Sequence, residues 1–296
     1  MPLVTGSWAT SYSEGWEPGA RIKIPKYEYE VYNFLSKNLL HGQRILSLPL
    51  QSPLTGTTNY FATDILLFMG IPSFSGYGYM PELDNKIYIA LADQINSEDT
   101  RNLSQELAVL GIKYITVHLD YNPKSFVSGY LTNLSKLIST LNNTKGLTYV
   151  GRIGQRAIYE VKDPYPLIYA TSIPMELNRS IYSFPNDIPR ILSNPVVNYS
   201  VISPVSYEVN IQNATKPFIL VFGKTFDSNW QLECDELSTK HYLVYGFANG
   251  WLINKTGSFT LRIYYTPQKL YEITIIATFI GLIVPFSLLV FNILRR

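Results

Sequence analysis

The chain is poor in cysteine and in charged residues. Its one cysteine, Cys234, excludes a disulfide within the chain and a zinc site built on thiolates. Charged residues make up 16% of the 296 residues and the formal net charge is +2, so we expect no nucleic-acid partner. Tyrosine is abundant at 23 residues, and Asn, Ser and Thr are frequent. This polar but uncharged composition is typical of an extracytoplasmic protein.

Patterns for common catalytic and cofactor sites are also missing. No serine lies in a GxSxG elbow, and His41, His118 and His241 are too scattered for a local metal motif. Segment 151–156, GRIGQR, lacks the third glycine and the following helix of a dinucleotide site, so it indicates a hairpin turn. We therefore expect no metal, no cofactor and no catalytic residue in this chain.

Three acidic residues, Asp227, Asp235 and Glu236, are candidates for sugar chemistry. A glycosidase needs two carboxylates that face a sugar across about 5 to 9 Å. Asp227 stands in a predicted turn, TFDSNW, where Asp normally caps backbone groups. Capping is therefore the preferred interpretation of this residue.

The longest apolar run lies at the C-terminus. The 22 residues from Ile273 to Leu294 carry no charge, and a helix of this length covers about 33 Å, enough to cross a bilayer. Arg295 and Arg296 follow, so the positive-inside rule predicts a cytoplasmic C-terminus. We expect a single-pass protein of the cell membrane with residues 1 to about 268 outside the cell.

The N-terminal segment bears on how such a chain crosses the membrane. It has no basic n-region and no apolar h-region, so it does not form a secretory signal peptide. We expect either the tail of a longer multi-spanning protein or a chain inserted by its C-terminal helix. The first option explains the missing signal more simply.

Sequons for N-glycosylation are more frequent than chance predicts. The composition gives roughly three by chance, whereas the sequence has seven, all before the apolar run. Accidental sequons in an Asn- and Thr-rich chain are the alternative, but the excess favours glycosylation of several sites. The sequons begin at Asn102, Asn133, Asn142, Asn178, Asn198, Asn213 and Asn254.

The order of elements predicts an α+β fold in four parts. Residues 1–24 form an irregular lead-in, and residues 25–163 alternate helix and strand patterns, which predicts a small α/β domain. Residues 164–268 hold short alternating strands, which predicts a membrane-proximal β-sandwich. Residues 269–296 would form the transmembrane helix with a short cytoplasmic tail.

Several elements are expected in detail. In the sandwich, one strand places Tyr207, Val209 and Ile211 on a single face. The α/β domain is expected to hold helices from near Pro25, at about Asp99 to Leu110 and at about 128–141, strands at 44–50 and 112–119, a short helix within 64–71 and a hairpin at 148–161.

Residues 218–268 carry a pattern of motifs. A strand ends in Thr-Phe at 225–226 and leads to Trp230, a Gly-Phe-Ala-Asn-Gly-Trp turn follows at 246–251, and an amphipathic strand ends in Tyr-Thr-Pro at 265–267. This region resembles the C-terminal extracytoplasmic part of multi-spanning membrane glycosyltransferases of the GT-C type. Both the arabinofuranosyltransferase-like proteins and the proteins that glycosylate teichoic acids belong to this group.

The resemblance extends loosely to the first domain through segments 44–50, 64–78 and 107–120. It implies that the catalytic acid lies in an early external loop of a multi-helix bundle, outside these 296 residues. The expected partners are the membrane and a multi-spanning glycosyltransferase or an envelope glycan. The chain would bind or position glycan or a partner as a non-catalytic module of a surface-glycan glycosyltransferase system.

Aromatic residues around the sandwich turns are the candidates for glycan contact, because flat rings suit the apolar faces of sugars. The alternative is that they fill the core or rest on the membrane interface, with Asn249 as a turn former. Loop 74–80, FSGYGYM, is a second candidate surface. The candidates for glycan contact are Trp230, Tyr245, Phe247, Asn249 and Trp251.

The alternative function for the chain is that of a glycosylated structural protein of the envelope.

Overall fold

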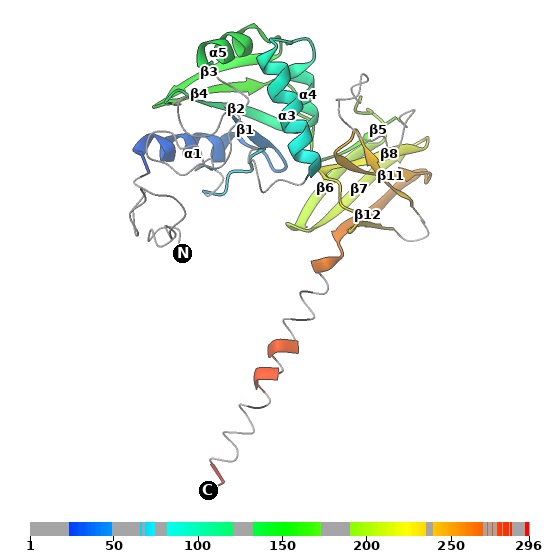
Figure 1. Ribbon diagram of the computed structural model, residues 1–296. Helices are drawn as coiled ribbons and strands as arrows, with labels where there is room; N and C mark the ends of the chain where they lie inside the picture. The colour runs from blue at the N-terminus through cyan, green and yellow to red at the C-terminus, as the bar shows by residue number, and fades with distance from the viewer. Residues whose placement is uncertain are drawn as a thin grey trace. The chain divides into compact units, whose positions relative to one another are not determined.

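The computed structural model describes residues 24–48, 66, 69–74, 82–120, 133–172, 190–234, 239–268 and scattered positions between 271 and 295. They form a mixed sheet with helices, followed by two antiparallel sheets, which confirms the α+β class (Figure 1). The chain divides into two compact units. Unit 1 comprises Met1–Leu167 with Ile181–Ile188, and unit 2 comprises Ile168–Ser180 with Pro189–Arg296.

Unit 1 is built on one mixed sheet. Its elements in chain order are α1 (Lys26–Asn38), β1 (Arg44–Leu48), α3 (Glu82–Asn96), α4 (Leu103–Val109), β2 (Ile112–His118), α5 (Leu134–Asn143), β3 (Leu147–Ile153) and β4 (Arg156–Val161). The strand order is β1-β2-β4-β3. β1 and β2 pair in parallel, and β4 pairs antiparallel with both β2 and β3.

Helices cover both faces of this sheet. Val31 and Leu35 of α1 are fully buried and pack in one cluster with Ile158 of β4. The next residue of β4, Tyr159, points to the opposite face and donates its hydroxyl to Asn142 of α5 at 3.0 Å. The helix predicted near Pro25 and the hairpin predicted at 148–161 are confirmed by α1 and by β3 with β4.

Unit 1 departs from the sequence expectations in two places. α3 was not predicted, although Ile87, Leu91 and Ile95 repeat at helical spacing and are buried. The helix expected from about Asp99 begins only at Leu103. The lead-in at 1–23, most of the segments expected at 64–71 and 74–80, and the first residues of the helix expected at about 128–141 lie outside the described residues. The rest of that helix is confirmed by α5.

Unit 2 consists of two antiparallel sheets. Its strands are β5 (Ile168–Thr171), β6 (Val196–Ser203), β7 (Ser206–Ala214), β8 (Phe218–Thr225), β9 (Trp230–Glu233), β10 (His241–Val244), β11 (Ala248–Ile253) and β12 (Gly257–Tyr265). The orders are β10-β11-β8-β5 in one sheet and β6-β7-β12-β9 in the other.

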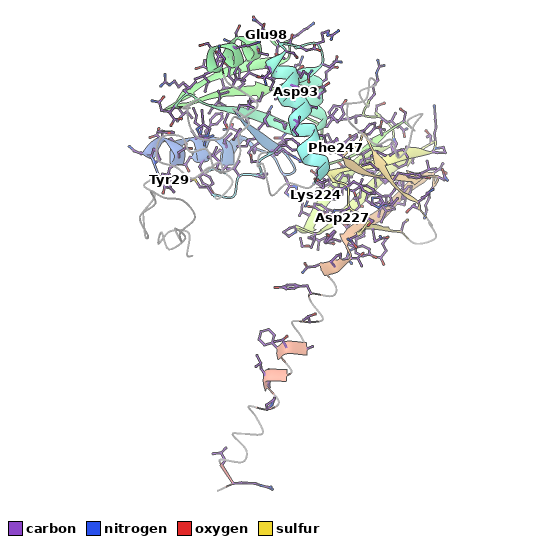
Figure 2. The ribbon with its side chains drawn as sticks, in the orientation of Figure 1. Tyr29, Asp93, Glu98, Lys224, Asp227 and Phe247 are labelled. Atoms are coloured by element: carbon purple, nitrogen blue, oxygen red, sulfur yellow. The ribbon has the colours of Figure 1, made fainter. Side chains whose placement is uncertain are left out.

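The two sheets of unit 2 share an apolar core. Tyr207, Val209 and Ile211 of β7 are buried, which confirms the face predicted for this strand. The ring of Tyr207 lies 5.1 Å from the ring of Phe222 in β8, so a contact joins the two sheets. Figure 2 shows the side chains of unit 2 and labels Lys224, Asp227 and Phe247.

The C-terminal apolar run lies largely outside the described residues. Those that are described between Tyr271 and Pro285 are helical and exposed. Within the described part of the chain, no helix combines the length and apolar character needed to span a bilayer. The predicted membrane helix stays a prediction.

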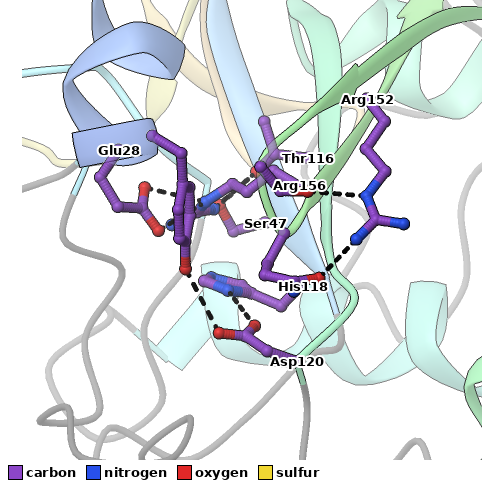
Figure 3. Close-up of polar contacts among 10 residues, drawn as sticks. Glu28, Ser47, Thr116, His118, Asp120, Arg152 and Arg156 are labelled. Atoms are coloured by element: carbon purple, nitrogen blue, oxygen red, sulfur yellow. Dashed lines mark hydrogen bonds and ion pairs between the residues drawn. The ribbon is translucent and has the colours of Figure 1, made fainter. Parts of the chain in front are cut away.

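A buried ion pair joins α1 to β4 in unit 1 (Figure 3). Nε of Arg156 donates to both carboxylate oxygens of Glu28, at 3.1 and 3.0 Å, and both side chains are at most 4% exposed. Nη1 of Arg156 donates to the hydroxyl of Thr116 at 3.1 Å, and that hydroxyl lies 2.9 Å from the hydroxyl of Ser47. These polar groups therefore satisfy one another beneath α1.

Replacing Arg156 by Ala should destabilise unit 1 by about 3 to 5 kcal/mol, because Glu28 would remain buried without its counter-charge. Hydrogen exchange followed by mass spectrometry should show faster exchange in β2 and β4 and unchanged exchange in unit 2. Arg152→Ala is the matched control, because Arg152 is exposed and bonds only to the adjacent turn in the described contacts. Equal effects of the two substitutions would contradict a structural role for the pair.

Candidate functional site

The predicted glycan-contact residues lie together in unit 2, and four of the five are buried. Trp230 is 6% exposed, Phe247 and Trp251 are 1% exposed and Asn249 is 0% exposed. Tyr245 is half-buried and donates its hydroxyl to Thr171 at 3.0 Å. These rings fill the sandwich core, so a ligand at the surface would meet their half-buried neighbours first.

Asn249 of β11 is the centre of a polar contact group. Its Oδ1 accepts a hydrogen bond from the backbone N–H of Asp227 at 3.2 Å and lies 3.0 Å from Nε2 of His241. Its Nδ2 donates to the backbone carbonyls of Lys224 at 2.9 Å and Thr225 at 3.2 Å. One buried amide thus fixes the end of β8 and the residues that follow it.

The imidazole of His241 lies between two aromatic rings. It stacks on Trp251 with centroids 4.7 Å apart and planes 9° apart, and the ring of Phe226 lies 4.8 Å from it. Burial lowers the pKa of His241 below its ordinary value, against opposing contributions from Asn249 and Asp227. The half-buried His241 is therefore mainly neutral at pH 7.

Asp227 occupies the turn between β8 and β9. Its Oδ1 accepts from the backbone N–H of Asn229 at 2.9 Å, which is the capping role predicted for this turn, and its Oδ2 accepts from the hydroxyl of Tyr265 at 2.7 Å. Burial acts to raise the pKa of Asp227, but these hydrogen bonds and nearby His241 hold it below its ordinary value. The carboxylate is ionised and held in place. We call Phe226, Asp227, His241, Asn249 and Tyr265 the Asp227 cluster.

Trp230 supports this cluster from the core. Its ring lies 5.0 Å from the ring of Tyr265 and 4.8 Å from that of Phe222. Lys224 places its ammonium group 5.4 Å from the centre of the Trp230 ring and donates to the carbonyl of Pro204 at 2.9 Å. The predicted residues thus surround Asp227, which the sequence offered as a candidate for sugar chemistry, and they contact His241 and Tyr265, which the sequence did not predict as glycan contacts.

Unit 1 holds a second titratable group at the end of β2 (Figure 3). Nδ1 of His118 lies 3.5 Å from Oδ1 of Asp120, and the hydroxyl of Tyr27 donates to Oδ2 of Asp120 at 3.3 Å. Burial, together with nearby Asp120, raises the pKa of Tyr27 well above its ordinary value. Tyr27 therefore stays a neutral donor, and the group ties the start of α1 to the end of β2.

The described sequons all present their asparagine at the surface. Asn133 caps α5 by accepting a hydrogen bond from the N–H of Lys136 at 3.1 Å, and Asn142 accepts one from Tyr159. Asn178 lies outside the described residues. The exposed asparagines are Asn102, Asn133, Asn142, Asn198, Asn213 and Asn254.

Comparison with known proteins finds similarity among solved structures. No protein-family model and no curated protein matches the chain. The arabinofuranosyltransferase AftD from Mycobacteria matches at 14% identity and a TM-score of 0.42, covering 82% of this chain and 30% of that one. The C-terminal globular domain of an oligosaccharyltransferase from Archaeoglobus fulgidus matches at 10% identity and a TM-score of 0.29, covering 48% of this chain and 100% of that one.

The present chain therefore spans about a third of the AftD chain. The resemblance to arabinofuranosyltransferase-like proteins that the motifs at 218–268 predict is confirmed, because such a protein is among the similar structures.

Asn249→Ala should destabilise unit 2 by about 2 to 4 kcal/mol, because it removes the hydrogen bonds that the buried amide makes to backbone groups of Lys224, Thr225 and Asp227. Urea unfolding followed by hydrogen exchange of unit 2 peptides would measure this. Asn210→Ala is the control, because the side chain of Asn210 accepts a hydrogen bond from the hydroxyl of the exposed Thr260 and has no other side-chain hydrogen bond within the described part of unit 2. A loss no larger than that of the control would contradict the role of Asn249.

Unit 2 should also lose stability on acidification. His241 and Asp227 both have folded-state pKa values below their ordinary ones, so the unfolded chain binds protons more readily. The His241 contribution is present above about pH 6.5 and is lost as the pH falls through its lowered pKa. The Asp227 contribution is lost at lower pH. His241→Phe should flatten the dependence of the free energy of unfolding on pH just below about pH 6.5. An unchanged slope there would contradict the assignment.

Proposed function

We propose that this chain is an extracytoplasmic, membrane-anchored module of a surface-glycan glycosyltransferase system, and that it binds glycan at the Asp227 cluster. The resemblance of residues 218–268 to the C-terminal extracytoplasmic part of GT-C-type glycosyltransferases supports the assignment to such a system. The single observation that carries the binding role is the hydrogen-bonded carboxylate of Asp227 beside the half-buried rings of Phe226 and His241, which contact each other at a tilt.

The chemistry of the cluster suits a polyhydroxyl ligand. The Asp227 carboxylate is ionised and accepts hydrogen bonds, as sugar hydroxyls require. The ring of Phe226, half-buried and in contact with His241, offers an apolar surface next to it. Tyr265 and Asn229 hold the carboxylate, so little side-chain freedom is lost when a ligand binds.

The same features favour binding over hydrolysis. A general acid in a glycosidase needs a raised pKa, whereas that of Asp227 is lowered. A second carboxylate at catalytic separation is also required, and Asp235 and Glu236 lie outside the described residues. Asp227 is therefore assigned as a ligand acceptor, with the catalytic acid on a partner or upstream segment.

Asp227→Asn should weaken glycan affinity by about tenfold or more, because a charge-assisted hydrogen bond contributes about 1.5 to 3 kcal/mol. Titration calorimetry of the full chain with arabinofuranosyl oligosaccharides and with teichoic-acid fragments would measure this. Glu208→Gln is the matched control, because Glu208 is an exposed carboxylate of β7. It should leave the affinity unchanged.

The proposal fails if the wild-type chain binds neither class of glycan. That result would favour the glycosylated structural protein of the envelope. Equal losses in the Asp227→Asn and Glu208→Gln proteins would instead show that the glycan binds away from the Asp227 cluster.

A further inference from the structure

Strand β6 is an edge strand with little of the usual protection, because its pairing with β7 is regular from Val196 to Val201 and shifts register only between Val201 and Ser203. It runs for eight residues from Val196 to Ser203, and among the described strands it pairs only with β7 (Figure 1). Its sequence, VVNYSVIS, contains no charge, proline or glycine. Val196, Val201 and Ile202 are 45%, 40% and 56% exposed. An edge of this kind is a template for pairing with another chain.

The other described edge strands each carry a limiting feature. β5, β9 and β10 are only four residues long. β3 has a register shift between Tyr149 and Gly151 and carries the exposed charge of Arg152. The outer edge of β1 is partly covered, because Ile45 forms an isolated β-bridge with Ser73. Short length, irregular register and charge are the devices that keep sheet edges from pairing. β6 shifts register only after Val201, near its C-terminal end, so the regular part from Val196 to Val201 needs a different device.

A sequon stands in the middle of β6. Asn198-Tyr199-Ser200 places its asparagine and its serine on the same side of the strand, and both are exposed. Asn198 lies opposite Asn210 of β7, on the outer surface that also carries Thr260. No other described sequon lies within an edge strand.

We propose that Asn198 carries an N-linked glycan and that this glycan keeps β6 from pairing with a second copy of the chain. An uncharged strand can lie antiparallel to its own copy without like charges meeting. A bulky, hydrated glycan at its midpoint blocks that approach. The inference rests on the extracytoplasmic location in the proposed function.

The modification is a group transfer from an oligosaccharide donor esterified to a lipid phosphate. The amide nitrogen of Asn198 forms a bond to the anomeric carbon as the bond from that carbon to the phosphate oxygen breaks. The lipid phosphate leaves with the electron pair, and the amide loses one proton to the transferring enzyme. Ser200 supplies the sequon hydroxyl.

The first test is mass spectrometry of the full chain from its native host. Electron-transfer fragmentation of the tryptic peptide 191–224 separates Asn198 from Asn213, and a glycan is expected on Asn198. An unmodified Asn198 with a glycan on Asn254 would overturn the inference but would leave the proposed extracytoplasmic location of the chain standing. Bare asparagines at every sequon would overturn both.

The second test is sedimentation of the purified full-length variants. Asn198→Gln should shift the chain to about twice the mass of the wild-type species, whereas Asn254→Gln, which removes an exposed sequon after β11, should not. Adding Val201→Lys to Asn198→Gln should restore the wild-type mass, because a charge on the edge opposes pairing. If the Asn198→Gln protein sediments like the Asn254→Gln protein, the proposal that the Asn198 glycan prevents β6 from pairing is overturned. Glycan affinity at the Asp227 cluster should be the same in all these variants.

Discussion

The buried amide of Asn249 is the contact on which the candidate site depends. It bonds to backbone groups at the end of β8 and to Asp227 in the turn that follows, and the same oxygen lies next to His241. A carboxylate at this position could not donate to the carbonyls of Lys224 and Thr225. The half-buried geometry of Asp227 and His241 is therefore set by a neutral group inside the core.

In unit 1, a buried ion pair, and not a neutral amide, holds the surrounding elements in place. The Glu28–Arg156 pair and the hydroxyls of Thr116 and Ser47 satisfy one another at the interface between α1 and the sheet. A buried pair of this kind gives little net stability, but removing one partner is costly. It therefore fixes how α1 lies on the sheet, much as Asn249 fixes the turn of unit 2.

The fold was predictable where its signals are local. Alternation in Tyr207, Val209 and Ile211 predicted the buried face of β7, because side chains of a strand alternate between faces. α3 was missed although Ile87 and Leu91 lie at helical spacing, because the preceding residues are rich in Gly, Pro and Tyr and indicate loops.

The site was predictable only in outline. The motif residues Trp230 and Trp251 were found, but a sequence does not tell a ring that fills a core from one that meets a ligand. Asp227 and His241 converge through the pairing of β8 with β11 and of β11 with β10. Such pairing joins residues that no local pattern relates, so the cluster emerges only from the folded sheets.

The strand order of unit 1 has a consequence for synthesis. β4 lies between β2 and β3 although it is the last of the four strands to leave the ribosome. β3 has no sheet partner among the described strands until β4 has been synthesised. Glu28 likewise has no ion-pair partner until Arg156, which lies 128 residues later in the chain. Contacts this distant slow folding and leave strand edges open on the nascent chain. The sheet of unit 1 therefore cannot be completed until residue 161 is made.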